Sequence, residues 1–120
     1  MKTLILLAHG SRHPATAEEM AALATQVGAV ARCKVSHAFL EINRPNLSEA
    51  IAQAIAEGAG VVSVLPLFVN TGNHVVRDLP RLVADARARH PRAEIVLLRH
   101  VGTHPAYTAA IETIAREVGD

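Results

Sequence analysis

Five side chains that can bind metals or transfer protons lie at or near the ends of apolar segments. His9 directly follows an apolar run, and Glu41 lies near the end of the next one. His74 lies in a polar segment after the third run, and His100 and His104 flank the end of the fourth. Imidazole and carboxylate groups suit divalent transition metals, and they also form acid–base sets near neutral pH. The residue types therefore indicate metal binding or proton transfer, if the fold brings these positions together.

Apolar runs alternate with segments of helical periodicity along the chain. Strands are expected at 3–8, 34–42, 60–69 and 93–101, and helices at 16–31, 45–58, 78–90 and 103–119. This alternation predicts an α/β fold with a four-stranded parallel sheet flanked by helices on both faces. Ligands of such sheets bind outside the carboxyl ends of the strands. The candidate side chains should therefore converge on one edge of the sheet.

Three helix starts have a recognisable signal. Asn46 and Glu49 have the spacing of a capping box, which predicts the start of the second helix. Pro80 favours a third helix that begins near Asp78, because proline is tolerated in the first turn. Thr103 is a candidate cap for the last helix.

Size and composition exclude several classes of protein. A chain of 120 residues is expected to form one domain, 1–120, with a single hydrophobic core. The net charge of +1 and the presence of only two Phe and one Tyr argue against nucleic-acid binding. Cys33 is the only cysteine, so neither a disulfide framework nor a cysteine metal cluster is possible. No apolar run is long enough to cross a membrane, and no signal-peptide pattern is present, so we expect a cytoplasmic location.

The segment after the third strand and several basic residues suggest what kind of ligand binds. Gly72, two residues before His74, is typical of a tight turn that presents the histidine. Basic residues are expected near the same edge: Arg12, Arg44, Arg77, Arg81 and Arg99. The nearby acids are Glu41 and Asp78, so the mouth of the site should be positive. Such a mouth favours an anionic ligand with several carboxylates.

A structural role is the alternative for each of these residues. His13 and His90 precede prolines in expected loops and fit solvated or locally bonded side chains. His37 lies within a strand and fits a hydrogen-bonded structural histidine. His9 alone would be a weak indication of function, and only its combination with a second histidine and a carboxylate strengthens the functional hypothesis.

Four motifs in this order resemble the small sirohydrochlorin chelatases, the short cobaltochelatase type. They are LLAHGSR, FLEINRPNLSEAI, PLFVNTGNHVVRDLP and GTHP, and together they extend over nearly the whole chain. The first motif alone is only moderately specific. Its combination with the G-x-H-x-x-x-D-[IL]-P pattern, which includes Gly72, His74 and Asp78, makes the resemblance strong.

The resemblance implies insertion of a divalent metal into sirohydrochlorin without ATP or an organic cofactor. His9 and His74 match the two active-site histidines of the family, which implies that they bind the metal, and Glu41 resembles the carboxylate that joins them. We expect substrate contacts from residues within the same motifs: Ser11, Arg12, Arg44, Asn70, Gly72 and Arg77. The chain resembles half of a chelatase-like two-domain fold, which implies a homodimer. Cobalt is the expected metal, with nickel and iron as alternatives.

Three other classes of protein are alternatives to a chelatase. A histidine phosphatase would need an arginine before the histidine, where this chain has Ala8. A response-regulator receiver would need acidic residues after the first strand and an aspartate at the end of the third, where Leu65 and Pro66 stand. A metal or tetrapyrrole carrier would use the same ligands as a chelatase, so the sequence leaves that alternative open.

Overall fold

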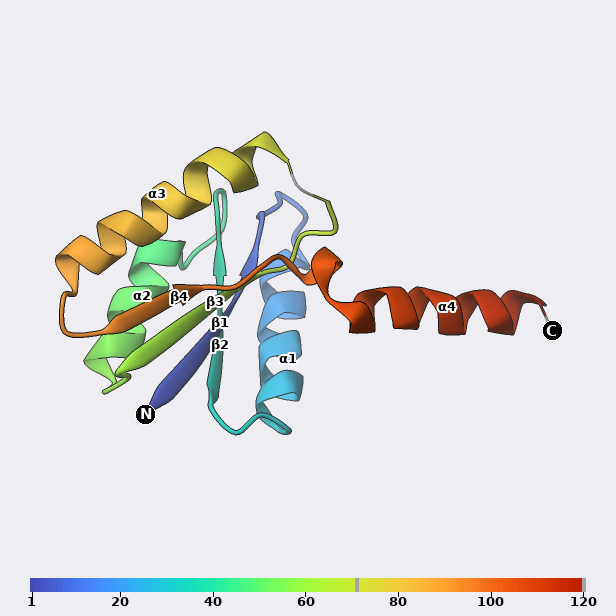
Figure 1. The fold of residues 1–120 in the computed structure, drawn as a ribbon, viewed down its shortest axis with the longest axis horizontal. Coiled ribbons are helices and arrows are strands. Elements are labelled where there is room, and N and C mark those ends of the chain that lie inside the picture. Colours follow the sequence, from blue (N-terminus) through green and yellow to red (C-terminus); the bar gives the residue numbers. More distant parts are fainter. Residues whose placement is uncertain (71, 120) are drawn as a thin grey trace.

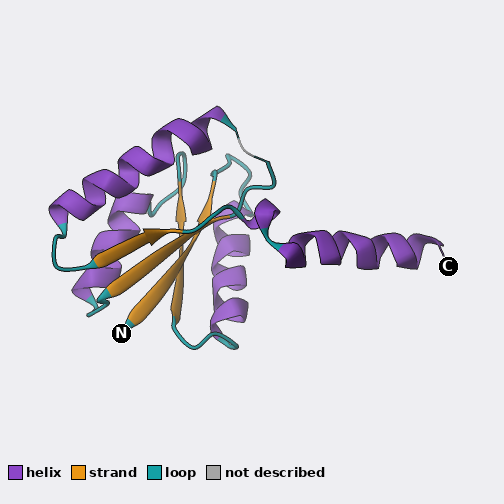
Figure 2. Cartoon of the chain, in the orientation of Figure 1, coloured by secondary structure: helices purple, strands orange, loops and turns teal. Residues whose placement is uncertain are grey.

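The chain alternates between strands and helices, as the sequence predicts. The computed structural model describes residues 1–70 and 72–119, the side chains of residues 73–76 excepted. The elements are β1 (Lys2–Ala8), α1 (Thr16–Gly28), β2 (Lys34–Phe39), α2 (Leu47–Ala56), β3 (Val61–Pro66), α3 (Asn73–Arg89), β4 (Glu94–Leu97), the 3₁₀ turn η1 (Val101–Thr103) and α4 (Pro105–Gly119). Figure 2 distinguishes the helices, strands and loops by colour. None of the described helices is long and apolar enough to span a membrane.

The four strands form one parallel sheet in the order β2-β1-β3-β4. Strand β1 lies in the middle, with Leu6 opposite His37 of β2 and Leu65 of β3. The predicted parallel sheet with helices on both faces is confirmed: α2 and α3 lie on one face and α1 on the other (Figure 1). All strands run in the same direction, so their carboxyl ends share one edge, as expected for the candidate site.

Each face of the sheet has its own apolar cluster. Alternate β1 residues divide between them, because successive side chains of a strand point to opposite faces. Ile5 and Leu7 pack with α2 and α3, and both are fully buried. Leu6 packs with Met20 of α1 and Phe39 of β2 on the other face. This interior strand is thus buried on both sides.

Helix α3 begins five residues earlier than the sequence predicts. It starts at Asn73 with Gly72 as its N-cap, and Pro80 lies inside the helix rather than in its first turn. Leu79 is completely buried against the core, and this packing stabilises the helix although proline removes one backbone hydrogen bond. Residues 73–77, expected in a loop, are therefore helical.

Helix α4 departs from the predicted arrangement. Thr103 is part of η1, and the side chain next to α4 that accepts a backbone hydrogen bond is His104, whose Nδ1 lies 3.0 Å from the Ala106 N–H donor atom. The helix extends away from the sheet instead of covering it (Figure 1). No described residue of α4 is buried.

The predicted capping box at the start of α2 is confirmed. The Asn46 side chain accepts a hydrogen bond from the Glu49 backbone N–H at 2.8 Å, and Glu49 accepts one from the Asn46 N–H at 2.9 Å. We expect Asn46→Ala to lower the free energy of unfolding by about 1 kcal/mol, because one helix N–H loses its partner. Urea denaturation measures this change. Gln53→Ala, an exposed substitution in the same helix, should cost less than about 0.5 kcal/mol, and an equal loss in both variants would contradict the role of the cap.

Candidate active site

The ends of β1 and β2 bring a histidine and a carboxylate into direct contact. His9 directly follows β1, Glu41 lies two residues after β2, and Nε2 of the imidazole is 2.7 Å from Oε1 of the carboxylate. The two side chains are 48% and 58% exposed, so incoming molecules can reach them. The predicted convergence of these two residues is therefore confirmed as geometry. With the carboxylate ionised, Glu41 accepts the Nε2 proton of a neutral imidazole.

Backbone hydrogen bonds extend beyond the strands and hold the two residues in register. Leu40 donates to the carbonyl of Ala8 at 2.9 Å, and Glu41 donates to the carbonyl of His9 at 3.1 Å. Directly afterwards the Asn43 N–H donates to the Glu41 carbonyl at 2.8 Å. This tight turn places Ile42 at a φ of 71°, which is strained for a β-branched residue. The strained turn fixes Glu41 toward His9, and such strain is typical of functional sites.

Gly10 allows the loop after β1 to approach this turn closely. Its φ is +109°, and a Cβ atom there would lie 1.9 Å from the Glu41 carbonyl oxygen. Next to it, the Ser11 N–H donates to Oδ1 of Asn43 at 2.7 Å, and the Ser11 hydroxyl accepts from the His13 N–H at 3.0 Å. Any side chain at position 10 would therefore push apart the two loops that hold the His9–Glu41 pair.

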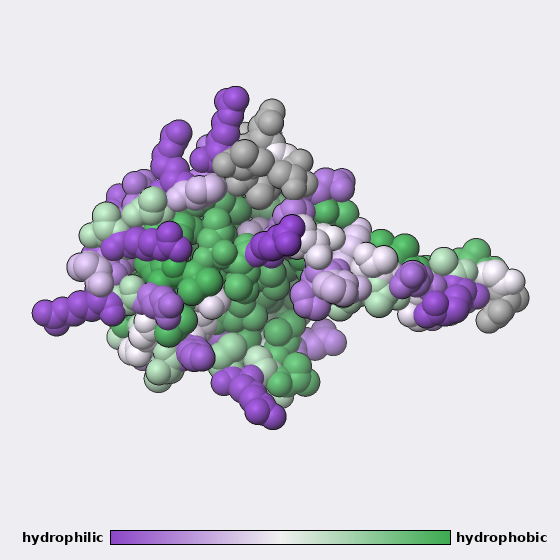
Figure 3. Space-filling view, in the orientation of Figure 1, coloured by the Kyte–Doolittle hydropathy of each residue, from purple (hydrophilic) through white to green (hydrophobic). Residues whose placement is uncertain are grey.

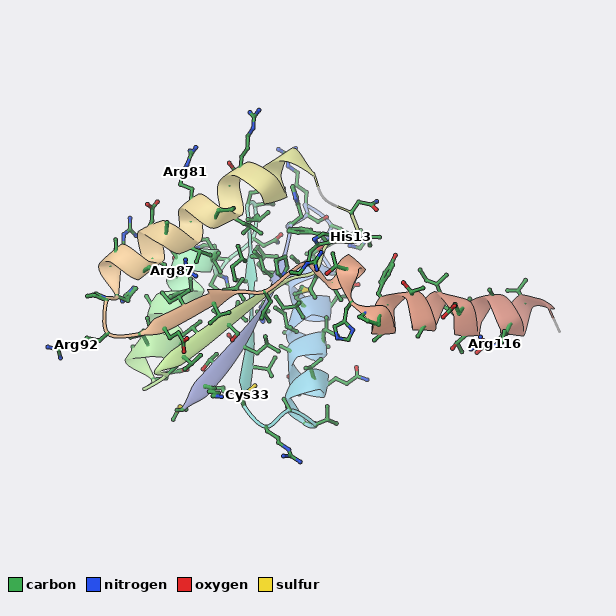
Figure 4. All side chains as sticks on the ribbon, viewed as in Figure 1. His13, Cys33, Arg81, Arg87, Arg92 and Arg116 are labelled. Carbon is green, nitrogen blue, oxygen red and sulfur yellow. The ribbon has the colours of Figure 1, made fainter. Side chains whose placement is uncertain are left out.

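The pair opens into a pocket of about 240 Å³. Its lining comes from the two loops and from one face of α3: His9, Leu40, Glu41, Asp78, Arg81 and Leu82. Phe68, from the segment after β3, presents its ring to the His9 imidazole in an edge arrangement with centroids 6.4 Å apart. Arg81 extends outward from α3 and so stands at the rim of the pocket (Figure 4).

The second predicted histidine, His74, belongs to α3. His74 lies in the first turn of α3, but its side chain is outside the described part of the structure. Among the side chains that are described, no group of three or more His, Cys, Asp or Glu residues is arranged to hold a metal. Asn70 and Gly72 lie at exposed positions before α3, and Arg77 is exposed on the helix. The involvement of all four residues stays a prediction.

Arg44 lies away from the His9 pocket. Its guanidinium pairs with Glu49 in the first turn of α2, and this hydrogen bond holds the pKa of Glu49 below its usual value. Both residues line a different pocket, of about 540 Å³, at the outer edge of β2 with His37. The local acid in α2 thus orients Arg44, and its position does not support the predicted contact with substrate. Arg12 is exposed in the loop after β1.

The described residues of the pocket do not form the positively charged mouth that the sequence predicts. The described lining of the His9 pocket includes one arginine, Arg81, and two carboxyl-bearing residues, Glu41 and Asp78. Arg99 lines other pockets, near the end of β4. The charge of the described pocket lining is therefore mixed. From sequence, Arg81 is one of several basic residues, and its spacing of three from Asp78 places both on one helix face.

Two histidines outside the pair make local contacts. Nδ1 of His13 accepts a hydrogen bond from Ala15, in agreement with the locally bonded role expected for it. His37 stacks edge-on against Phe39 with centroids 5.6 Å apart, and burial lowers its pKa. This packing fits the expected structural role, and the hydrogen bond expected for His37 stays a prediction.

Comparison with known proteins identifies the family. The CbiX family model matches residues 3–118. The chain belongs to the CbiX family. Its fold is close to that of a CbiX protein from Marinobacter aquaeolei VT8, described as a cobalamin biosynthesis protein, with a TM-score of 0.84 and 28% identity over 98% of this chain and 96% of that one.

Longer relatives contain this CbiX unit as a part. A sirohydrochlorin cobaltochelatase of Priestia megaterium is 28% identical over 120 residues, which make up 100% of this chain and 39% of the relative. The sirohydrochlorin chelatase SirB of Bacillus subtilis, solved with cobalt, has the same fold with a TM-score of 0.83 at 24% identity, over 98% of this chain and 50% of SirB. The chain thus spans well under two thirds of the length of the first of these relatives.

Proposed function

We propose that this CbiX chain inserts a divalent metal ion into sirohydrochlorin without ATP. The observation that carries the proposal is the His9–Glu41 pair, 2.7 Å apart and exposed at the carboxyl edge of the sheet. Membership in the CbiX family and the names of its relatives support the same activity. The metal ion is a substrate here, and no organic cofactor is part of the proposal.

The geometry of the pair suits a metal ion that binds briefly. At the right angle of octahedral coordination, ligand bonds of about 2.1 Å from an imidazole nitrogen and a carboxylate oxygen leave those two atoms about 3 Å apart. Nε2 of His9 and Oε1 of Glu41 are already near that separation, so an ion that binds between them, with the imidazole proton carried on Nδ1, needs little rearrangement. His74, at the start of α3, is the proposed third ligand. A site with few protein ligands releases the ion readily to a ring with four nitrogens.

Insertion requires two protons to leave the ring. The tetrapyrrole loses two N–H protons as the divalent ion enters. The charge of the metal-loaded ring therefore equals that of the free ring. Once the ion has left the pair, the His9 imidazole and the Glu41 carboxylate can act as bases beside the ring. Each can accept one proton and pass it to solvent, because both side chains are about half exposed. The same two groups thus serve as ligands first and as bases afterwards.

An absorbance time course tests this proposal and identifies the metal. Sirohydrochlorin is mixed with Co²⁺, Ni²⁺ or Fe²⁺ under anaerobic conditions, with and without the chain. We expect cobalt to give the largest rate above the enzyme-free background, in line with the cobaltochelatase names of the relatives. Equal rates with and without the chain for all three metals would refute the proposed function.

Arg81 is the proposed contact for a substrate carboxylate at the rim of the pocket. We expect Arg81→Ala to raise KM about fivefold with little change in kcat, because an exposed ion pair contributes up to about 1 kcal/mol. Arg44→Ala is the matched control, since Arg44 pairs with Glu49 outside this pocket. Initial rates over a range of sirohydrochlorin concentrations distinguish the two variants. A larger KM effect from Arg44→Ala would contradict the assignment.

We also infer that two copies of the chain act together. A flat macrocycle is larger than the pocket of about 240 Å³, so one copy leaves much of it uncovered. Relatives such as SirB are about twice as long as this chain, which fits a second unit of the same kind. A homodimer would supply that second unit here.

A further inference from the structure

Ile42 adopts a backbone conformation that its side chain disfavours. Its φ is 71°, and among the described residues other than glycine it is the one with a positive φ. A β-branched side chain is strained in this conformation, whereas glycine and asparagine adopt it readily. The tight turn between Glu41 and Asn43 requires the backbone conformation but not this side chain. The presence of isoleucine at this position therefore needs a separate explanation.

Packing within the chain does not supply that explanation. Ile42 is 57% exposed, and it belongs to neither of the two apolar clusters formed by the described residues. Exposure alone does not distinguish it, since hydrophobic residues also reach the molecular surface in the centre of the view in Figure 3 and along α4. Ile42 differs because it combines exposure with backbone strain. This combination is expected at a position whose side chain serves function rather than stability.

The turn holds Ile42 at the carboxyl edge of the sheet, next to the proposed ligands. It directly follows Glu41, whose carboxylate lies 2.7 Å from the His9 imidazole. Two hydrogen bonds join the turn to the loop after β1: the Glu41 N–H donates to the His9 carbonyl at 3.1 Å, and the Ser11 N–H donates to the Asn43 side chain at 2.7 Å. The Ile42 side chain is thus presented to solvent from a backbone that is fixed on both sides of it.

A macrocycle placed over the His9–Glu41 pair has to extend onto the surface around the pocket. The pocket of about 240 Å³ is too small for the whole ring. An ion passes from the pair to the ring nitrogens through one face of the ring, so that face must lie over the pair. Ile42 adjoins the pair without lining the pocket, and it is therefore placed to meet the part of the face that the pocket leaves uncovered.

We propose that the Ile42 side chain supports the apolar face of the tetrapyrrole and thereby helps to select a flat macrocycle as substrate. This inference rests on the proposed function. The strained turn then has two roles, because it directs Glu41 toward His9 and also holds an aliphatic side chain against the ring beside them. An asparagine at position 42 would form the same turn with less strain but without the apolar contact. The same substitution should therefore raise stability and lower substrate affinity.

Binding of metal-free sirohydrochlorin tests the contact separately from insertion. The tetrapyrrole is titrated with each variant, and Kd is obtained from the change in its fluorescence. Ile42→Asn should raise Kd about tenfold, or about 1.4 kcal/mol, because roughly half of an isoleucine side chain loses its apolar contact. Ile42→Leu keeps an aliphatic side chain and should bind within about twofold of the wild type. Val30→Asn is the matched control, since Val30 is 83% exposed just after α1, and should leave Kd unchanged.

Thermal unfolding and insertion kinetics give two further readouts. Ile42→Asn should raise the Tm by about 3 °C, because it relieves the strain of the turn. It should raise KM for sirohydrochlorin about tenfold and change kcat less than about twofold, since the His9–Glu41 pair stays in place. A lower Tm for Ile42→Asn would show that the side chain packs within the chain and would overturn the proposal.

The binding results separate this inference from the proposed function. If the wild type binds metal-free sirohydrochlorin and Ile42→Asn binds it equally well, the contact is wrong and the insertion chemistry is unaffected. If the wild type does not bind the tetrapyrrole at all, the proposed function fails and this inference fails with it. Light scattering tests a second copy of the chain as the alternative occupant. A mass for Ile42→Asn that differs from that of the wild type would assign Ile42 to a contact between copies, which also overturns the proposal.

Discussion

Gly10→Ala should lower the rate of metal insertion about 100-fold while the chain still folds. An alanine Cβ would lie 1.9 Å from the Glu41 carbonyl oxygen, and the φ of +109° is strained for alanine. The two loops must move apart, and the His9–Glu41 contact of 2.7 Å opens. A displacement of about 1 Å in a positioned catalytic group can cost a factor of about 100.

The control for Gly10→Ala is Gly28→Ala at the end of α1. There the added Cβ meets only the Cβ of Val35 at 3.7 Å, an ordinary contact, so the rate should stay near that of the wild type. Initial insertion rates and thermal unfolding are measured for both variants. If Gly10→Ala keeps the wild-type rate, the contact between His9 and Glu41 does not matter for the reaction.

His9→Ala should remove most of the insertion activity, by a factor between about 100 and 10,000, because it deletes both a ligand and a base. The fold should persist, since the His9 side chain is 48% exposed and lies outside the core. His74→Ala should have an effect of similar size if both histidines bind the same ion. The double variant should then be little worse than either single one, because residues that act as a unit are not additive.

The pattern among these variants distinguishes alternative ligand sets. Initial rates above the enzyme-free background are compared for the wild type, both single variants and the double. His90→Ala, in the segment between α3 and β4, is a matched substitution away from the site and should keep the wild-type rate. If His74→Ala retains near wild-type rates with every metal, His9 works with Glu41 and another partner instead.

The part of the site that follows from strand order could be predicted from sequence. Apolar runs that alternate with helical segments specify a parallel sheet, and such a sheet places His9 and Glu41 at the same edge. Two other features, the position of Arg44 and the start of α3, depend on local contacts that cannot be inferred from the periodicity of the sequence. Arg44 turns away because Glu49 offers it a partner in α2. Helix α3 starts early because buried Leu79 outweighs the cost of Pro80 inside the helix.

The position of α4 relative to the sheet could not be predicted from the sequence, for a different reason. Its apolar stripe of Ile111, Ile114 and Val118 predicts that the helix must be covered, but the stripe does not say which surface covers it. The direction of α4 is set at Gly102, whose lack of a side chain permits the close approach to Val69. That requirement arises from the folded structure and is invisible in the spacing of residues.

A His9–Glu41 site that catalyses insertion differs in turnover from one that only holds a metal or tetrapyrrole. The most direct measurement counts moles of cobalt-loaded sirohydrochlorin formed per mole of chain, with substrate in large excess and the enzyme-free reaction subtracted. We expect many equivalents for the wild type and about background for His9→Ala. Product that stops at one equivalent per chain or per dimer would contradict it and identify the protein as a carrier.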